Sequence, residues 1–209
     1  YPIHNFPTHD ARAKRIDELL QKRGSNFTTA YFADMQLDLL DVRARELVPN
    51  ILQSLKSQPQ HERLETAIKL LADWDYVATT DSKAACIFYP LLEKRSHIQF
   101  METVLGKSPL ITTMSSIAPA LNRFDISHFM AEGSPWRAHR DTLDKIIADN
   151  VIAIVEYLTT NYAEDWSWGK IHQIRFGHSL RKHKPWQAIH VGPDPIGGSA
   201  TTLRMAQHN

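Results

Sequence analysis

Apolar side chains recur every three to four residues along most of the chain, which is the period of an amphipathic helix. Between Gly24 and Gly106 there is no glycine, and glycine disfavours a helix interior more than any residue except proline. The pattern therefore predicts an array of helices. The first is expected over residues 10–22, with Asp10 as its N-cap.

The next part of the chain continues the helical period. Thr28 is expected to cap a helix that carries on to Pro49, where the proline breaks or restarts it. A further helix is predicted from about Glu62 to Trp74, because its apolar residues lie on one face.

The ends of the remaining helices are indicated by residues that typically start, bend or terminate a helix. One is predicted from Ser82 to Gly106, with a bend at Pro90. Another should begin at Ser134-Pro135, where a capping side chain precedes a proline at the first helical position. Its buried stripe is expected to comprise Leu143, Ile146, Ile147, Val151, Ile154, Val155 and Leu158.

Beyond Trp168 the alternation changes to the period of a strand. Strands are predicted over residues 171–176, near 187–191 and near 200–205. So short a sheet would have open edges, which proteins normally pair or cover. We therefore expect an α+β fold, in which a mainly helical lobe is followed by strands whose partners lie outside the sequence.

Composition and charge narrow the classes of function. A chain of 209 residues with 43% hydrophobic composition can bury a core. A net charge of +1 gives no electrostatic reason to expect a nucleic-acid or membrane partner, and neither a membrane-spanning run nor a secretory segment is evident. The single cysteine, Cys86, is predicted to be a small buried hydrophobe. A start on Tyr1-Pro2 without methionine suggests a piece of a longer polypeptide.

The histidines and the glycine pair are weak candidates for chemistry. His172, His178, His183 and His190 match no recognised zinc spacing. Gly197-Gly198-Ser199 lacks the second flanking glycine of a nucleophile elbow, so a turn is favoured.

Three other groups of residues favour structural roles. Asp73 and Asp75, two residues apart on a helix, would not face each other as an acid–base pair. The basic run 181–184 is interpreted as a solvated loop. The tryptophans are expected to pack rather than to line a pocket; they are Trp74, Trp136, Trp166, Trp168 and Trp186.

Three stretches together carry a family resemblance. Residues 165–178 combine paired tryptophans, a glycine and alternating His and Arg residues; Met35-Gln36-Leu37-Asp38 lies upstream, and Val191-Gly192-Pro193 followed by Gly197-Gly198-Ser199 lies downstream. In this order, they resemble the β-chain of penicillin acylases. These are N-terminal-nucleophile amide hydrolases, and the family includes acyl-homoserine lactone acylases.

The resemblance covers nearly the whole chain and implies a division into parts. Residues 1–24 would lead out of the catalytic core, and residues 25–164 would form a helical lobe. Residues 165–209 would supply strands of a four-layer αββα core. The remaining α-chain and β-chain segments of the same precursor are the implied protein partners.

The resemblance also implies a mechanism. Members of the family cleave themselves to free a serine, whose hydroxyl attacks an amide while its own α-amino group acts as the base. Asparagine and backbone donors hold the oxyanion. Tyr1 cannot be this nucleophile, so both the serine and the asparagine are expected outside the chain. Arg12 is aligned with an arginine that supports the asparagine, and Arg15 is the fallback.

Other properties follow from the family alone. No cofactor is expected, although some members bind a structural calcium; the nearest match here is Asn5, which is a weak ligand for a hard cation. The implied substrates are small-molecule N-acyl amides, whether β-lactam side chains or acyl-homoserine lactones. The resemblance also implies a role in antibiotic metabolism or quorum quenching, synthesis as a zymogen, and a periplasmic or secreted location.

Two alternatives to an active enzyme remain open. The chain could be a noncatalytic helical interaction module with a small β appendage. It could also be an inactive remnant of an acylase. In each case, as in the acylase interpretation, the segment alone is predicted to be inactive.

Overall fold

A computed structural model describes residues 11–94, 96–106, 126–177 and 190–206. Contacts divide the chain into two compact units. We call them the helical unit and the mixed unit. The described residues of the helical unit are 44–74 and 87–163, except 95 and 107–125, and the other described residues belong to the mixed unit. The three-part division expected from the sequence stays a prediction.

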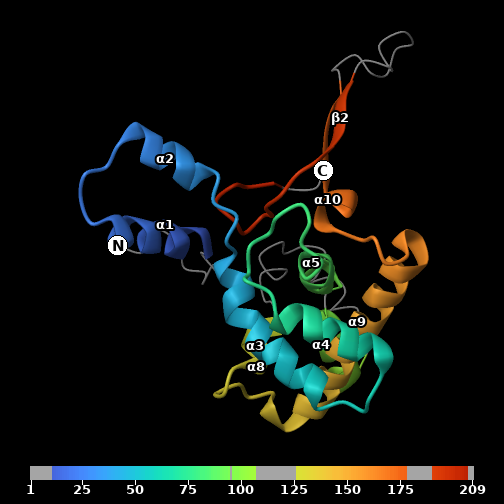
Figure 1. The fold of residues 1–209 in the computed structure, drawn as a ribbon. Coiled ribbons are helices and arrows are strands. Elements are labelled where there is room, and N and C mark those ends of the chain that lie inside the picture. The colour runs from blue at the N-terminus through green and yellow to red at the C-terminus, as the bar shows by residue number, and fades with distance from the viewer. Residues whose placement is uncertain (1–10, 95, 107–125, 178–189, 207–209) are drawn as a thin grey trace. The chain divides into compact units, whose positions relative to one another are not determined.

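The helices that contribute to the helical unit are shown in Figure 1. They are α3 (Val42–Lys56), α4 (Glu62–Ala72), α5 (Ala85–Glu93), α6 (Ser96–Leu105), α8 (Ile126–Met130), the short 3-10 helix η2 (Arg137–His139) and α9 (Arg140–Tyr162). The first residues of α3 and α5 belong to the mixed unit.

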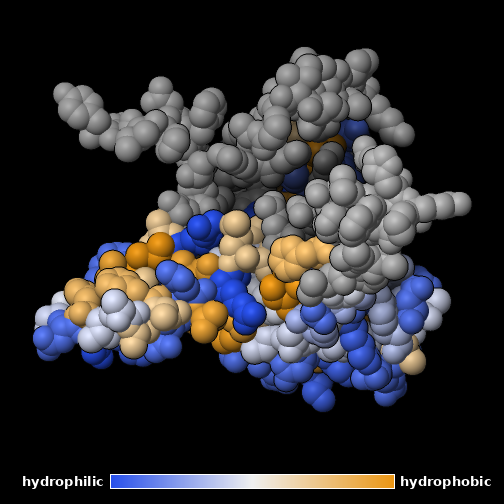
Figure 2. All heavy atoms as spheres, turned by 90° about the horizontal axis from the view of Figure 1, so that it is seen from above, coloured by the Kyte–Doolittle hydropathy of each residue, from blue (hydrophilic) through white to orange (hydrophobic). Residues whose placement is uncertain are grey.

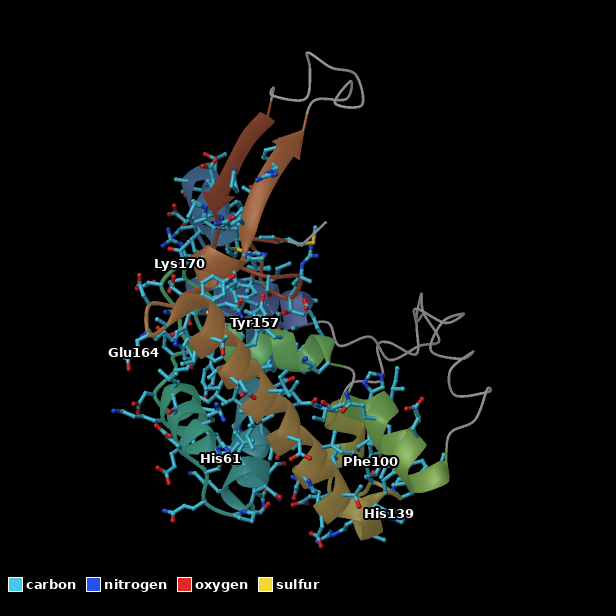
Figure 3. The ribbon with its side chains drawn as sticks, turned by 90° about the vertical axis from the view of Figure 1, so that its right-hand side faces the viewer. His61, Phe100, His139, Tyr157, Glu164 and Lys170 are labelled. Carbon is cyan, nitrogen blue, oxygen red and sulfur yellow. The ribbon has the colours of Figure 1, made fainter. Side chains whose placement is uncertain are left out.

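Helix α9 is central to the helical unit. It packs against α4 and against α6, and Figure 3 shows it running between α4, which begins after His61, and α6, which carries Phe100. The predicted apolar stripe is confirmed, except that Ile146 is only half-buried. The buried members are Leu143, Ile147, Val151, Ile154, Val155 and Leu158.

The predicted start of α9 is wrong. The helix begins at Arg140, after the turn of η2, and not at Ser134-Pro135. Ser134 Oγ accepts a hydrogen bond from the Trp136 amide at 3.3 Å. The hydroxyl therefore caps a local turn before the helix, an arrangement that serine favours as readily as a helix N-cap.

The predicted helix from Thr28 to Pro49 is divided in two. Thr28 does cap α2 (Thr29–Gln36), since its Oγ1 accepts from the Tyr31 amide at 3.1 Å. The chain then leaves the helix because Leu40 forms a β-bridge with Val77. Pro49 lies inside α3 and breaks nothing.

The predicted helix from Ser82 to Gly106 is also divided. Helix α5 ends at Glu93 and α6 begins at Ser96, whereas Pro90 lies within α5. Gly106 follows α6 with a φ of +81°, as a C-terminal glycine should.

The mixed unit holds the strands. It contains α1 (Ala11–Arg23), α2, α10 (Trp168–Ile171), β1 (Gln173–Gly177) and β2 (His190–Pro195). The strands pair antiparallel with an irregularity between Ile174 and Phe176. The fold class is α+β, as expected.

The strand predictions are only partly correct. The first strand begins two residues later than predicted because the α10 turn precedes it. The second reaches Pro195, and residues 187–189 lie outside the described part. The third, near residues 200–205, is wrong: Ser199 and Met205 form an isolated bridge there.

The buried core includes Cys86, which is fully buried as predicted. The tryptophan prediction is confirmed for the described residues: Trp74 packs against Phe88, and Trp136 against Phe100. Trp166 and Trp168 are buried, and Trp186 lies outside the described residues. No described helix is long and apolar enough to cross a bilayer.

Candidate functional site

Arg15 is held in a bidentate ion pair. Its Nε and Nη2 donate to the two carboxylate oxygens of Asp38, at 3.0 and 2.8 Å, and Nη1 donates to Glu18 at 3.1 Å. The hydrogen bond to Asp38 is the main reason that the pKa of Arg15 is raised. Arg15 therefore ties α1 to the segment that carries Gln36 and Asp38.

Arg12 has a different environment on the same helix. Its side chain is exposed, and Nη1 lies 3.2 Å from the sulfur of Met205. A thioether is a weak acceptor, while a guanidinium carries five N–H donors. Among the described residues, Arg12 therefore lacks the strong acceptors that Arg15 has.

Asp41 is a fully buried carboxylate at the start of α3. Its Oδ1 accepts from the Arg43 amide at 2.8 Å, which makes it the N-cap of the helix. Its Oδ2 accepts from Thr201 Oγ1 at 2.5 Å and from Ser199 Oγ at 3.3 Å. One side chain thus joins a helix start to a loop about 160 residues later.

We call residues 196–206 the C-terminal loop. Gly198 is a fixed point of this loop: its amide donates to Ala78 O at 2.8 Å, and its carbonyl accepts from Trp168 Nε1 at 2.9 Å. Its φ of +90° favours glycine. The Arg204 amide donates to Asp38 O at 3.0 Å. The loop is therefore bound to the α2–α3 connection and to α10.

His172 is a packed residue in the mixed unit. Its ring stacks on Trp168, with centroids 4.4 Å apart, and its Nδ1 lies 2.9 Å from Ile196 O. At 2% exposure, it is not open to a substrate. His178 and His183, and the side chain of His190, lie outside the described residues.

The structure describes only some of the residues on which the metal-site and basic-run interpretations depend. Within the described ranges, no three His, Cys, Asp or Glu side chains come together as a metal group. Asn5, the position nearest to the family's calcium ligand, and the basic run 181–184 lie outside the described residues. Asp75 accepts from the Val77 amide at 3.0 Å, which is a turn contact.

Ser199 is the described serine closest to a catalytic arrangement, because its hydroxyl contacts a buried carboxylate. Its Oγ also lies 3.0 Å from Thr201 Oγ1. A serine nucleophile needs a group that removes its proton, usually an imidazole or an amine; neither is among the described partners of Ser199 Oγ. The cluster stabilises a turn, as the sequence predicted.

Asp41 and Thr201 were not predicted as site residues. The sequence did contain a signal for Asp41, since an aspartate directly before an apolar helical run is a typical N-cap. The expected continuous helix to Pro49 concealed this signal. The contact with Thr201 depends on tertiary structure.

Comparison with known proteins identifies the family. The family model described as penicillin amidase matches residues 1–209. No curated protein matches the chain. Because the family model spans every residue, the chain belongs to the penicillin amidase family, whose members are acylase-like hydrolases of amides.

Proposed function

We propose that the chain is a β-chain segment of a penicillin-acylase-like amidohydrolase that cleaves N-acyl amide bonds. The observation that carries the proposal is the family match over residues 1–209. The substrates are small-molecule N-acyl amides, such as β-lactam side chains or acyl-homoserine lactones.

The nucleophilic serine and the oxyanion asparagine lie outside residues 1–209 in this proposal. Its support is the surroundings of Ser199, whose hydroxyl contacts Asp41 and Thr201 and is 5% exposed as a residue. A buried hydroxyl whose described partners are a carboxylate and another hydroxyl, with neither an imidazole nor an amine among them, is a poor nucleophile. We therefore propose that other segments of the same precursor, freed by self-cleavage, supply the reacting groups. The proposed location of the protein is the periplasm or the outside of the cell.

Arg12 is the proposed positioning residue of this chain. Its exposed guanidinium can donate to the oxyanion asparagine, whereas the donors of Arg15 are engaged with Asp38 and Glu18. Arg12 acts through the asparagine and touches no reacting atom. Its loss should affect the transition state more than substrate binding.

The test uses the complete, processed enzyme. Arg12→Ala should lower kcat for an acyl amide on the order of 10- to 100-fold with little change in KM, and Arg12→Lys should restore part of it. Arg15→Ala should mainly lower thermal stability. If Arg12→Ala leaves kcat unchanged while Arg15→Ala lowers it in a folded protein, the roles are reversed.

Maturation provides a separate test. The N-terminus of the mature β-chain should be serine, and its replacement by alanine should abolish self-cleavage. A full-length protein that is neither cleaved nor active on acyl amides would favour the noncatalytic module or the inactive remnant.

A further inference from the structure

Met205 is the most exposed methionine that the structure describes. It is 55% exposed, whereas Met130 is 5% exposed, and Met35 and Met101 are half-buried. Met114 lies outside the described residues. Peroxides oxidise a thioether more readily when solvent reaches it. Among the described methionines, Met205 is therefore the one expected to react first.

A cation lies directly beside the sulfur of Met205. Arg12 Nη1 donates to Met205 Sδ at 3.2 Å, and a thioether sulfur is only a weak acceptor. Hydrophobic and hydrophilic side chains lie next to one another over α1, which carries Arg12, and α2 (Figure 2). Both residues of the pair are exposed in this chain, so a small solute can reach them.

Asp38 anchors both segments that carry the pair. Its carbonyl oxygen accepts from the amide of Arg204 at 3.0 Å, directly before Met205 in the sequence. Its carboxylate accepts from Arg15 Nη2 at 2.8 Å, and Arg15 lies one turn along α1 from Arg12. The contact between Arg12 and Met205 is therefore supported by two further contacts of a single residue.

Oxidation turns the sulfur of Met205 from a weak acceptor into a strong one. With hydrogen peroxide, a sulfur lone pair attacks one oxygen, and the S–O bond forms as the O–O bond breaks. The departing hydroxide takes the proton of the transferred oxygen and leaves as water. The sulfur is oxidised by two electrons and the peroxide is reduced by two. The product is a polar sulfoxide, whose oxygen can accept a charge-assisted hydrogen bond from a guanidinium.

We propose that Met205 is an oxidation site at which the sulfoxide oxygen binds Arg12. The bond engages the guanidinium that would otherwise donate to the oxyanion asparagine, so oxidation lowers kcat. A methionine sulfoxide reductase reverses the modification. The effect on kcat rests on the proposed function of Arg12, whereas the modification and the bond to Arg12 do not.

Peptide mass spectrometry tests the modification. The full-length processed protein is treated with hydrogen peroxide, and Met205 should gain one oxygen atom on the order of tenfold faster than Met130. Met130 is the matched control, because it is a buried methionine of the same chain. Equal rates at Met205 and Met130 would overturn the inference.

Melting temperatures test the bond to Arg12 and require no activity. Peroxide treatment should lower the Tm of Arg12→Ala by about 1 to 3 °C more than that of the wild-type protein, because only the wild-type protein can bind the sulfoxide oxygen. In a Met205→Leu background, the same treatment should shift the Tm equally with and without Arg12→Ala. Equal shifts in the wild-type protein and in Arg12→Ala would show that Arg12 does not bind the sulfoxide, which overturns the inference.

Kinetics test the effect on the reaction. Peroxide should lower the kcat of the wild-type protein roughly tenfold with little change in KM, and the reductase should restore it. Oxidation should cause no further loss in Arg12→Ala and none in Met205→Leu. A loss in Met205→Leu equal to that in the wild-type protein would place the effect at another residue and overturn the inference. A protein that is inactive before oxidation, yet shows the fast oxidation of Met205 and the Tm difference that depends on Arg12, would contradict the proposed function alone.

Discussion

Cys86 shows how burial sets the chemistry of a single residue. Desolvation is the main reason that folding raises the pKa of its thiol to about 12 from 9.0. The neighbouring hydrogen bond to Ser82 O, at 3.4 Å, is a weak contact of sulfur. The thiol is therefore neutral at physiological pH and inert as a nucleophile.

The pKa of Cys86 has a consequence for stability. Above pH 9 the unfolded chain loses the thiol proton while the folded chain keeps it. The stability that this thiol contributes is present below pH 9 and declines as the pH rises toward 12. Relative to Cys86→Ala, the wild-type protein should lose up to about 1.4 kcal/mol per pH unit in this window. Urea unfolding from pH 8 to pH 10 measures it, and parallel pH dependences would contradict it.

Gly198 is a residue at which no side chain fits. A Cβ there would lie 2.3 Å from Arg204 O, and the φ of +90° is strained for any other residue. Gly198→Ala should cost about 2 kcal/mol or more in the free energy of unfolding. Gly133→Ala is the control, since a Cβ at Gly133 meets nothing within 4 Å. Similar melting temperatures for the two variants would show that the C-terminal loop shifts freely.

At the scale of elements, Asp41 joins α3 to the C-terminal loop. Asp41→Ala removes the helix cap and leaves the hydroxyls of Ser199 and Thr201 without their acceptor. The cost should be about 2 kcal/mol in the free energy of unfolding. Thr201→Val, which removes one donor, should cost about 1 kcal/mol. Denaturant unfolding of the purified variants measures both.

The control for Asp41 is an exposed carboxylate on the preceding helix. Asp34→Ala should change stability by less than about 0.5 kcal/mol. Hydrogen exchange can localise the effect: in Asp41→Ala, the amides of Ser199 and Gly198 should exchange faster. Unchanged exchange there would mean that the backbone bond of Gly198 to Ala78 is sufficient to hold the loop.

The helical elements were predicted well where the apolar period was undisturbed. The range expected for α1 and the stripe of α9 follow from spacing alone, because a buried face needs apolar residues every three to four positions. The errors concern the residues at which the predicted helices begin and end. The Leu40–Val77 bridge, which interrupts the expected long helix, joins residues 37 positions apart, and no local propensity encodes it.

At the scale of the whole molecule, the chain on its own should not hydrolyse amides. The hydroxyl of Ser199 contacts the buried carboxylate of Asp41, but neither an imidazole nor an amine is among its described partners. Residues 1–209 purified alone should show no hydrolysis of an N-acyl anilide above background, whereas the complete processed protein should. Hydrolysis by residues 1–209 that Ser199→Ala abolishes would place the nucleophile within this chain.

The sequence singled out segments of the candidate site but did not predict that they lie together. By family resemblance it singled out α1, the Gln36-x-Asp38 segment and the glycine pair of the C-terminal loop, each in a different expected part of the chain; contacts group these segments in one compact unit. The sequence did not distinguish the two arginines. Arg12 and Arg15 are three residues apart on one helix, so periodicity cannot show that Arg15 reaches Asp38 while Arg12 stays exposed.

The sequence by itself determined the α+β class, the family, the main buried stripe and the burial of Cys86. These properties depend on composition, on apolar spacing and on motif order, which are local or linear features of a chain. Tertiary structure alone decided that Asp38 clamps Arg15, that Asp41 binds Ser199 and Thr201, and that His172 packs on Trp168. The Asp38 and Asp41 contacts join distant segments through directional hydrogen bonds, and the orientation of His172 is set by Ile196, 24 residues away. Their partners are selected by the folded backbone.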